Sequence, residues 1–147
     1  MGRFSDSEVE RELLAFLEIQ HGQDWDHMCD FFTPDAVYVE HAMGTFVGRE
    51  PIRQWLVPCM APLVGWEYPT RWFLVGDDRA VHYWDNILPT PAGDDGTYLF
   101  SGVTVLDYAG DHLWSREEDL YNEVEMNDVL QAWLAAGGRF GPAAGQA

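Results

Sequence analysis

Four strand-like stretches follow one another in the second half of the chain, without a helical segment between them. They read "EYPTRWFLVG", "RAVHYWDNIL", "TYLFSGVTVLDYA" and "HLWSREEDLYN". The stretches "GDDR" and "PTPAGDDG", which lie between them, are rich in turn-forming residues. Strands that are joined by short turns pair antiparallel, whereas parallel strands need long crossovers. The sequence therefore predicts a mostly antiparallel sheet.

Two helices are predicted near the N-terminus. The stretch "SDSEVERELLAFLEIQHG" has Ser5 or Ser7 as its N-cap, acidic residues in its first turn, a helical apolar stripe, and Gly22 at its end. The stretch "DWDHMCDFF" predicts a short second helix that is capped by Asp24 and stopped by Pro34. Both helices precede every long strand candidate.

A first strand, a third helix and a closing helix complete the pattern. "AVYVEH" alternates like a strand, "GREPIRQWLVPCMAPL" is helical from about Glu50 with Pro58 as a kink or an end, and "EMNDVLQAWLAAGG" closes the chain. This order predicts an α+β fold, a curved sheet with helices on one face that can form a cone around an internal pocket. Residues 1–147 are expected to form one domain, with a core over about 8–135 and a loose tail over 138–147.

Charge and cysteine content exclude several kinds of partner. The net charge is −17 and every basic residue is arginine, so nucleic acid and membrane surfaces are not expected partners. Since no stretch reads as a membrane span or an apolar signal core, a cytoplasmic location is expected. Cys29 and Cys59 have no metal-ligand spacing to the histidines, so we expect free thiols and no metal site.

Three phrases of the sequence resemble the nuclear transport factor 2-like superfamily. They are "DWDHMCDFFTPDAVYVEH", "GTFVGREPIRQWL" and "VTVLDYAGDHLWSREEDLYN". The superfamily includes SnoaL-like polyketide cyclases, ketosteroid isomerases, limonene-type epoxide hydrolases and scytalone dehydratases. The resemblance implies a cystatin-like α+β barrel, in which the sheet wraps three to four helices, and a homodimer formed through the outer sheet face. Because the scaffold hosts many chemistries, the resemblance names no single activity.

The catalytic residues of these relatives are only partly matched. Ketosteroid isomerases end the first strand with a carboxylate base, and this chain has His41 at that place. Their oxyanion tyrosine and its partner acid fall near Phe16 and Val103, which cannot donate a hydrogen bond from their side chains. The epoxide hydrolase set of Tyr, Asn, Arg, Asp and a last Asp falls on Tyr38, Glu40, Trp84, Asn86, and Glu117 or Glu118.

The first strand supplies the main catalytic candidate. Alternation places His41 on the same face as Val37 and Val39, which is the pattern of a core face. An imidazole titrates nearest to neutral pH and suits a general base; the alternative is a hydrogen-bonded structural histidine. The predicted catalytic set is His41 as the base, Glu40 or Glu118 as a relay, and Tyr38 and Asn86 to orient substrate or water.

Aromatic side chains supply the candidate pocket walls. They make up 14% of the chain and include seven tryptophans, which fits either a wide apolar pocket or a tryptophan-rich core. Periodicity alone does not decide which face of the strands at 79–88 and 112–121 points inward. The predicted substrate contacts are Trp25, Trp55, Met60, Trp72, His82, Trp84, Phe100, Trp114 and Arg116.

Together these residues predict a cofactor-independent acid–base enzyme that acts on a small apolar organic molecule. The reaction would be that of an isomerase, a cyclase, a dehydratase or a hydrolase that adds water to an epoxide. The alternative is a non-catalytic module of the same fold that binds a small ligand or dimerises. A buried, polar surrounding of His41 would favour the enzyme, and a solvent-facing His41 would favour the binding module.

Overall fold

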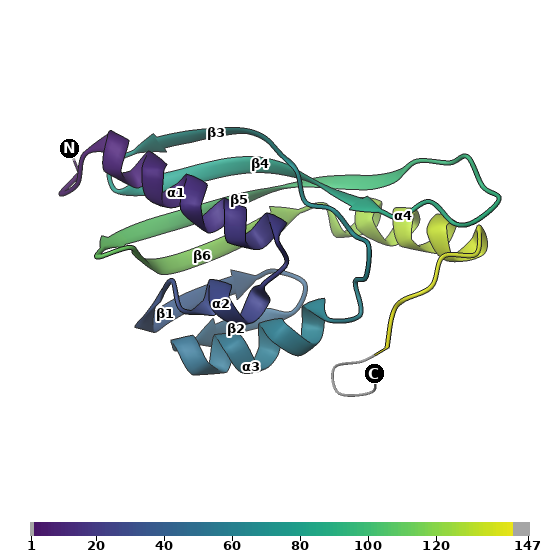
Figure 1. Cartoon of the computed structure of the whole chain (residues 1–147), viewed down its shortest axis with the longest axis horizontal. Coiled ribbons are helices and arrows are strands. Elements are labelled where there is room, and N and C mark those ends of the chain that lie inside the picture. The colour runs from purple at the N-terminus through teal and green to yellow at the C-terminus, as the bar shows by residue number, and fades with distance from the viewer. Residues whose placement is uncertain (1, 143–147) are drawn as a thin grey trace.

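The computed structural model describes residues 2–142 and shows a six-stranded sheet with four helices (Figure 1). The elements are α1 (Asp6–His21), α2 (Trp25–Cys29), β1 (Phe32–Glu40), β2 (Gly44–Val47), α3 (Arg49–Met60), β3 (Thr70–Gly76), β4 (Arg79–Leu88), β5 (Tyr98–Gly110), β6 (Leu113–Tyr121) and α4 (Glu123–Ala135).

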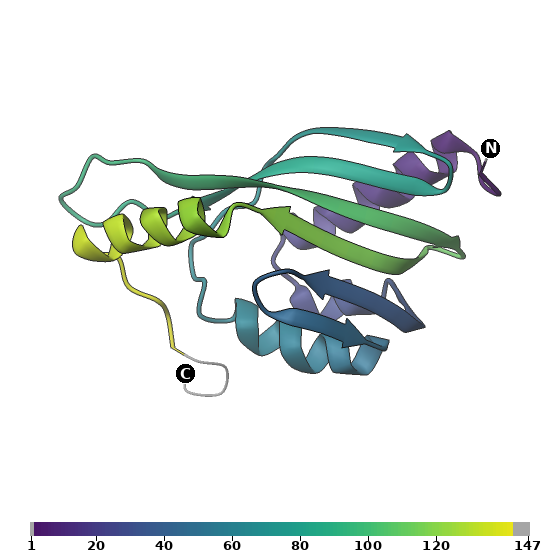
Figure 2. The same cartoon turned by 180° about the vertical axis from the view of Figure 1, so that it is seen from behind.

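The strand order is β2-β1-β6-β5-β4-β3, and the sheet is mixed. β1 pairs parallel with β6, and the other neighbours pair antiparallel. The predicted α+β class is confirmed, and the sheet stays open with β2 and β3 as its two edges (Figure 2). The parallel pairing brings together β1 and β6, two strands that lie far apart in the sequence. This pairing positions the candidate site.

Local capping explains where the first helices begin. The Ser5 side chain accepts a hydrogen bond from the backbone N–H of Glu8 at the start of α1, and Asp24 caps α2 in the same way through His27. Gly22 follows the last turn of α1, as predicted. α1 buries its apolar stripe, including Leu13 and Phe16, against the sheet.

Two elements differ from the sequence-based expectation. The first strand begins at Phe32 rather than Ala36, and the pairing of β1 with β6 is irregular between Phe32 and Val37, which accommodates Pro34. The segment from Gly44 to Val47, to which the sequence analysis assigns no strand, forms the short edge strand β2. Pro58 lies inside α3 and does not end it.

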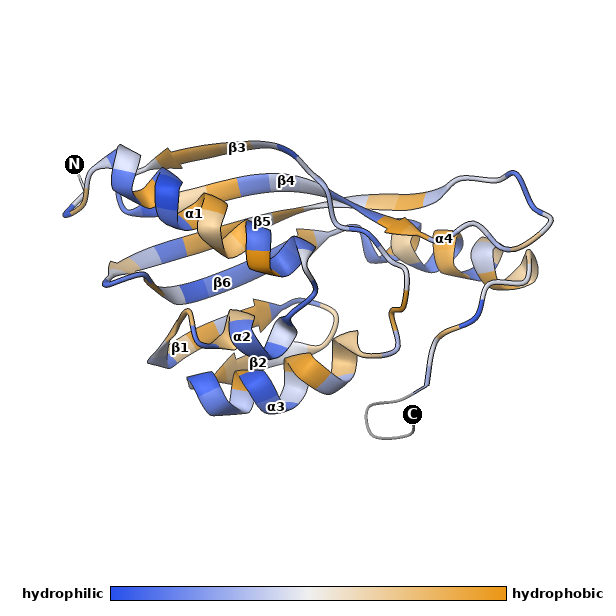
Figure 3. Ribbon diagram, viewed as in Figure 1, coloured by the Kyte–Doolittle hydropathy of each residue, from blue (hydrophilic) through white to orange (hydrophobic). Residues whose placement is uncertain are grey.

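The helices α1, α2 and α3 cover one face of the sheet, and α4 contacts β5 at the far end of the molecule (Figure 1). Hydrophobic and hydrophilic residues alternate along the strands (Figure 3). The core between α1 and the sheet contains Phe16, Phe32 and Trp114, whose rings lie within ordinary aromatic contact distance. Within the described residues, no helix is long and apolar enough to cross a membrane.

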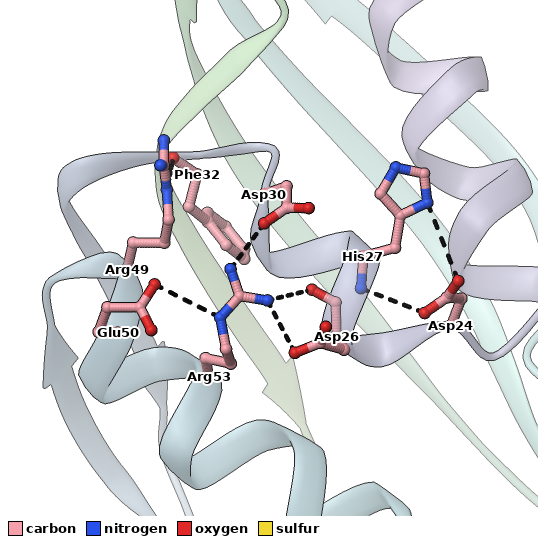
Figure 4. Close-up of polar contacts among 8 residues, drawn as sticks. All are labelled: Asp24, Asp26, His27, Asp30, Phe32, Arg49, Glu50 and Arg53. Atoms are coloured by element: carbon pink, nitrogen blue, oxygen red, sulfur yellow. Dashed lines mark hydrogen bonds and ion pairs between the residues drawn. The ribbon is translucent and has the colours of Figure 1, made fainter.

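Arg53 on α3 connects this helix to α2 through ion pairs. Its guanidinium group binds the carboxylates of Asp26 at 2.8 Å and Asp30 at 2.7 Å, and it also reaches Glu50 one turn away on α3 (Figure 4). Arg53 is mostly buried, while its three acidic partners are exposed. These contacts fix the position of α3, which forms one wall of the cavity described below.

The described part of the C-terminal tail, residues 138–142, packs against the domain. The Phe140 ring lies 5.4 Å from that of Trp133 and 6.1 Å from that of Trp66. The backbone N–H of Gly141 donates to the carbonyl of Pro62. This part of the expected loose tail is therefore held in place, and residues 143–147 lie outside the described residues.

Candidate functional site

A cavity of about 330 Å³ lies between the inner face of the sheet and the helices. Its volume is in the range of pockets that hold small organic molecules. Aromatic and methionine side chains form most of its wall, and a few polar groups converge on its floor. The lining residues are Gln20, Trp25, Met28, Tyr38, Glu40, Met43, Trp55, Leu56, Cys59, Met60, Leu63, Trp66, Tyr68, Trp84, Asn86, Phe100, Thr104, Asp119, Tyr121, Met126, Leu130 and Phe140.

The carboxylate of Asp119 on β6 is fixed in the cavity by two side-chain hydrogen bonds. The Tyr38 hydroxyl on β1 donates to its Oδ2 at 2.6 Å, and the Thr104 hydroxyl on β5 donates to its Oδ1 at 2.6 Å. Asp119 lies between these two strands, opposite Glu40 on one side and Thr104 on the other. Two short hydrogen bonds from neighbouring strands leave the carboxylate little rotational freedom.

The hydrogen-bond chain continues to the far wall of the cavity. The indole Nε1–H of Trp84 donates to the Thr104 hydroxyl at 2.8 Å, which orients that hydroxyl toward Asp119. Trp84 on β4 lies opposite Gly102 on β5, and a side chain at Gly102 would overlap the indole ring. Gly102 therefore allows Trp84 to lie across β5 and reach Thr104.

Burial changes the protonation of Asp119. Its removal from water raises the carboxyl pKa to about 6, although the hydrogen bonds from Thr104 and Tyr38 act in the opposite direction. Burial and the Asp119 charge together raise the pKa of Tyr38 well above its ordinary value, so Tyr38 stays a neutral donor. The cavity thus holds a carboxyl group that exchanges its proton close to neutral pH.

Two further acids lie beside Asp119 on the inner face. Glu40 is the register neighbour of Asp119 on β1, and both of its carboxyl oxygens are buried without a hydrogen-bond partner among the described residues. Glu117, two positions before Asp119 on β6, is buried behind the cavity floor. Burial, followed by the Asp119 charge, raises the pKa of Glu117 well above its ordinary value. Burial raises the pKa of Tyr121 most, followed by the hydrogen-bonding approach of its hydroxyl to Glu40 and by the Glu40 charge.

Metal ligation is not a feature of this cluster. Within residues 2–142, no group of three or more His, Cys, Asp or Glu side chains has an arrangement that could hold a metal ion. The arrangement suits proton transfer instead, because a carboxyl group with a near-neutral pKa faces an apolar cavity.

A family model described as the SnoaL-like domain matches residues 13–116, which is more than half of the chain. The chain belongs to the SnoaL-like domain family. No curated protein matches the sequence.

Solved structures share the fold of this SnoaL-like domain. TerC, co-crystallised with polyporic acid, is 21% identical with a TM-score of 0.67, over 84% of this chain and 98% of its own. A structure described as a SnoaL-like polyketide cyclase from Shewanella putrefaciens CN-32 is 14% identical with a TM-score of 0.72, over 85% and 86%. An LEH-like epoxide hydrolase of M. tuberculosis is 18% identical with a TM-score of 0.71, over 89% and 95%. Identities this low show the fold alone.

Several predicted site residues of the SnoaL-like domain meet at the cavity. Tyr38, Glu40 and Asn86, expected to be catalytic, line it together. The expected wall residues Trp25, Trp55, Met60, Trp84 and Phe100 line it as well.

His41 and Glu118 lie on the outer side of the sheet. Alternation along β1 buries Ala36, Tyr38 and Glu40 instead of the valine face, so the predicted facing of His41 is wrong. The His41 side chain is 51% exposed, and its Nε2 lies 2.9 Å from Glu118 Oε1. Arg116 donates to the other oxygen of Glu118, so Arg116, too, points away from the cavity.

Besides Arg116, three expected substrate contacts lie outside the cavity. Trp72 is exposed on the outer face of β3 and stacks on Tyr83. His82 is buried in the core, where removal from water lowers the pKa of its imidazole to about 4. Trp114 is fully buried beside Phe16.

Sequence reasoning missed Asp119, Thr104 and Tyr121. Strict alternation from the buried Trp114 predicts that Arg116 and Glu118 face inward, but the β5–β6 register shifts between Tyr108 and Asp107. Trp114 pairs with Tyr108 and Arg116 with Asp107, so Ser115 is the extra residue of a β-bulge. The bulge reverses the facing of every later residue of β6. The one usable signal was the alternation of Glu117, Asp119 and Tyr121 two residues apart.

Proposed function

We propose that this SnoaL-like domain is an acid–base enzyme that moves a proton on a small, largely apolar organic molecule. Asp119 is the group that accepts and returns the proton. The observation that carries the proposal is the Asp119 carboxyl group, held by Tyr38 and Thr104 on the floor of an apolar cavity with a pKa of about 6. A pKa near the working pH is what general acid–base catalysis requires.

The surrounding residues have separate tasks in this proposal. The apolar wall excludes water and holds the hydrocarbon body of the substrate. Tyr38 and Thr104 aim the two oxygens of Asp119, and Glu40 beside it can take part in a proton relay. Asn86, which has an unpaired buried Oδ1, orients a polar group of the substrate or a water molecule.

The reaction class is isomerisation, cyclisation, dehydration or addition of water. Each of these steps begins or ends with a proton transfer, which a single positioned carboxyl group can carry out. The structural neighbours include a SnoaL-like polyketide cyclase and an epoxide hydrolase. The fold that these structures share with this chain therefore accommodates such reactions, and it does not select one of them.

Proton exchange with solvent tests the proposal before the substrate is known. A panel of apolar ketones is incubated with the protein in D₂O, and deuterium uptake next to the carbonyl is followed by NMR. A matching panel of apolar epoxides is followed for diol formation. Asp119→Asn should slow the reaction by about 10² to 10⁴, and Asp128→Asn, an exposed carboxylate on α4, should match the wild type.

Two results would contradict the proposed acid–base activity. One is Asp119→Asn turning over at the wild-type rate on a substrate that the wild type converts. The other is ligand binding in the cavity without turnover of any ketone or epoxide, which is the behaviour of the non-catalytic binding module. The solvent-facing position of His41 is the one observation that favours this module.

The second part of the proposal is a homodimer formed through the outer face of the sheet. Large apolar side chains are exposed on this face, a feature that is typical of protein interfaces. They belong to β2, β3 and β6, and they are Val47, Trp72, Leu74 and Leu120.

A further inference from the structure

The Glu40 carboxyl group is an unpaired polar group at the cavity floor. The residue is 6% exposed and lines the cavity, and neither Oε atom has a hydrogen bond of ordinary geometry among the described residues, although the Tyr121 hydroxyl approaches it. A buried carboxyl group without a partner is unfavourable. A ligand group that donates to Glu40 would therefore form a hydrogen bond of better geometry than the described protein side chains supply.

The other unpaired atoms of the cavity also favour a donor. Asn86 Oδ1 can only accept a hydrogen bond, and it is buried without a partner. The Tyr68 hydroxyl, which can accept as well as donate, is unpaired on the same cavity wall. Three of these fully buried, unpaired oxygens, two on Glu40 and one on Asn86, can serve only as acceptors when Glu40 is ionised.

The charge of the cavity is negative. Glu40 and Asp119 are register neighbours on adjacent strands, and strands lie about 4.8 Å apart. Among the described side chains that line the cavity, there is no arginine or histidine to balance them. Like charges on adjacent strands repel each other, and a cation between them reduces this repulsion. An anionic ligand would add to the repulsion.

The aromatic wall also suits a cation. The rings of Trp84, Phe100 and Tyr121 form one contiguous group on the sheet side of the cavity, with centroids 5.8 to 6.5 Å apart. Trp55 and Tyr38, with centroids 5.0 Å apart, lie toward α3. Faces of such rings attract ammonium groups, most strongly where water is excluded.

We propose that the cavity binds molecules that carry a protonated amine, with the ammonium group against Glu40 and the hydrocarbon body among the aromatic and methionine side chains. This inference rests on the proposed function, because it names the substrate class of the same cavity. Binding does not require turnover, so the two can be tested separately.

Three probes of similar size share a phenyl ring on a two-carbon chain and carry polar groups of different charge. The full chain is titrated by calorimetry at pH 8 with protonated phenethylamine, neutral 2-phenylethanol and anionic phenylacetate. We expect the amine to bind about tenfold or more tightly than the alcohol, and phenylacetate to bind most weakly. An alcohol that binds as tightly as the amine, or an amine that does not bind at millimolar concentration, would overturn the inference.

Matched variants test whether the Glu40 carboxylate is the source of the preference for the amine. Glu40→Gln should remove the preference for the amine over the alcohol while changing the affinity for the alcohol less than about twofold. Glu10→Gln removes one negative charge from the exposed surface of α1 and should leave all three affinities unchanged. An unchanged amine-to-alcohol ratio in Glu40→Gln would overturn the inference. If Glu40→Gln lost both ligands, Glu40→Asp would decide, because it keeps the charge and should keep the preference.

The outcomes distinguish amine binding, which is the further inference, from proton transfer by Asp119, which is the proposed function. An amine preference that depends on Glu40, without proton transfer on any ketone or epoxide, supports the inference and contradicts the proposed function. Proton transfer that depends on Asp119, without an amine preference, supports the proposed function and overturns the inference.

Discussion

Glu40 and Asp119 stand next to each other on the inner face of the sheet, one on β1 and the other on β6, and both line the same cavity. Their environments differ. Asp119 accepts two short hydrogen bonds, whereas Glu40 accepts none of ordinary geometry among the described residues and is approached only loosely by the Tyr121 hydroxyl. One acid is therefore positioned by the protein, and the other is free to interact with what enters the cavity.

Asp119 should make the stability of the domain depend on pH. Burial raises its pKa from 3.8 to about 6, so the folded state holds this proton more tightly than the unfolded state. Its contribution is full below pH 3.8 and is lost as the pH rises through about 6, a change of about 3 kcal/mol in the free energy of unfolding. Tyr38 and Glu40 from β1, and Glu117 and Tyr121 from β6, face or adjoin this carboxyl group.

Urea unfolding between pH 4.5 and 7.5 measures this effect, with wild type compared to Asp119→Asn. The amide does not titrate, so the wild type should lose stability relative to the variant as the pH rises. Arg116 and His41 lower the pKa of Glu118, so Glu118 makes the domain more stable as the pH rises. This effect is present in both proteins and does not contribute to the difference between them. A difference that stayed constant across this range would contradict the raised pKa of Asp119.

Replacing Glu40 by methionine should stabilise the domain. The substitution removes a buried, unpaired carboxyl group and fills a similar volume with an apolar side chain. We expect the free energy of unfolding to rise by about 1 to 3 kcal/mol. Glu10→Met, on the exposed face of α1, should change it by less than about 0.5 kcal/mol. A loss of stability in Glu40→Met would show that Glu40 has a stabilising role in the empty protein.

Gly102→Ala should disturb the cavity, because the new methyl group would overlap the Trp84 indole. The ring must then leave Thr104, and overpacking of this kind costs about 1 to 3 kcal/mol. Gly76→Ala is the matched control, since a methyl group at this strand glycine meets nothing within 4 Å. Thermal unfolding and tryptophan fluorescence report the two effects. Equal unfolding temperatures in the two variants would contradict the close approach of Trp84 to Gly102.

Leu74→Glu should convert the proposed dimer into a monomer. Leu74 is among the most exposed large apolar side chains, and it lies on the outer sheet face. A charge buried there without a partner would disfavour association. Val124→Glu, equally exposed but on α4, should remain dimeric. The mass in solution at micromolar concentration decides, and a monomeric wild type would contradict the dimer.

The order of elements could be read from the sequence because it depends on local signals. Ser5, Asp24 and Gly22 mark helix ends wherever the rest of the chain lies. The run of strands after α3 reads clearly through its alternation and its turns. β2 could not be predicted, because a strand of four residues is too short to show a clear alternation of apolar and polar residues.

The facing of the strands could not be read in the same way. The sequence by itself determined that Tyr38 and Glu40 share one face of β1 and that Glu117, Asp119 and Tyr121 alternate on β6. Only the tertiary structure decided that these faces point inward. Both faces of β1 carry apolar residues, so alternation does not distinguish them, and the bulge at Ser115 reverses the pattern of β6. The cavity floor arises from the parallel pairing of β1 with β6, a contact between distant segments that no local signal encodes.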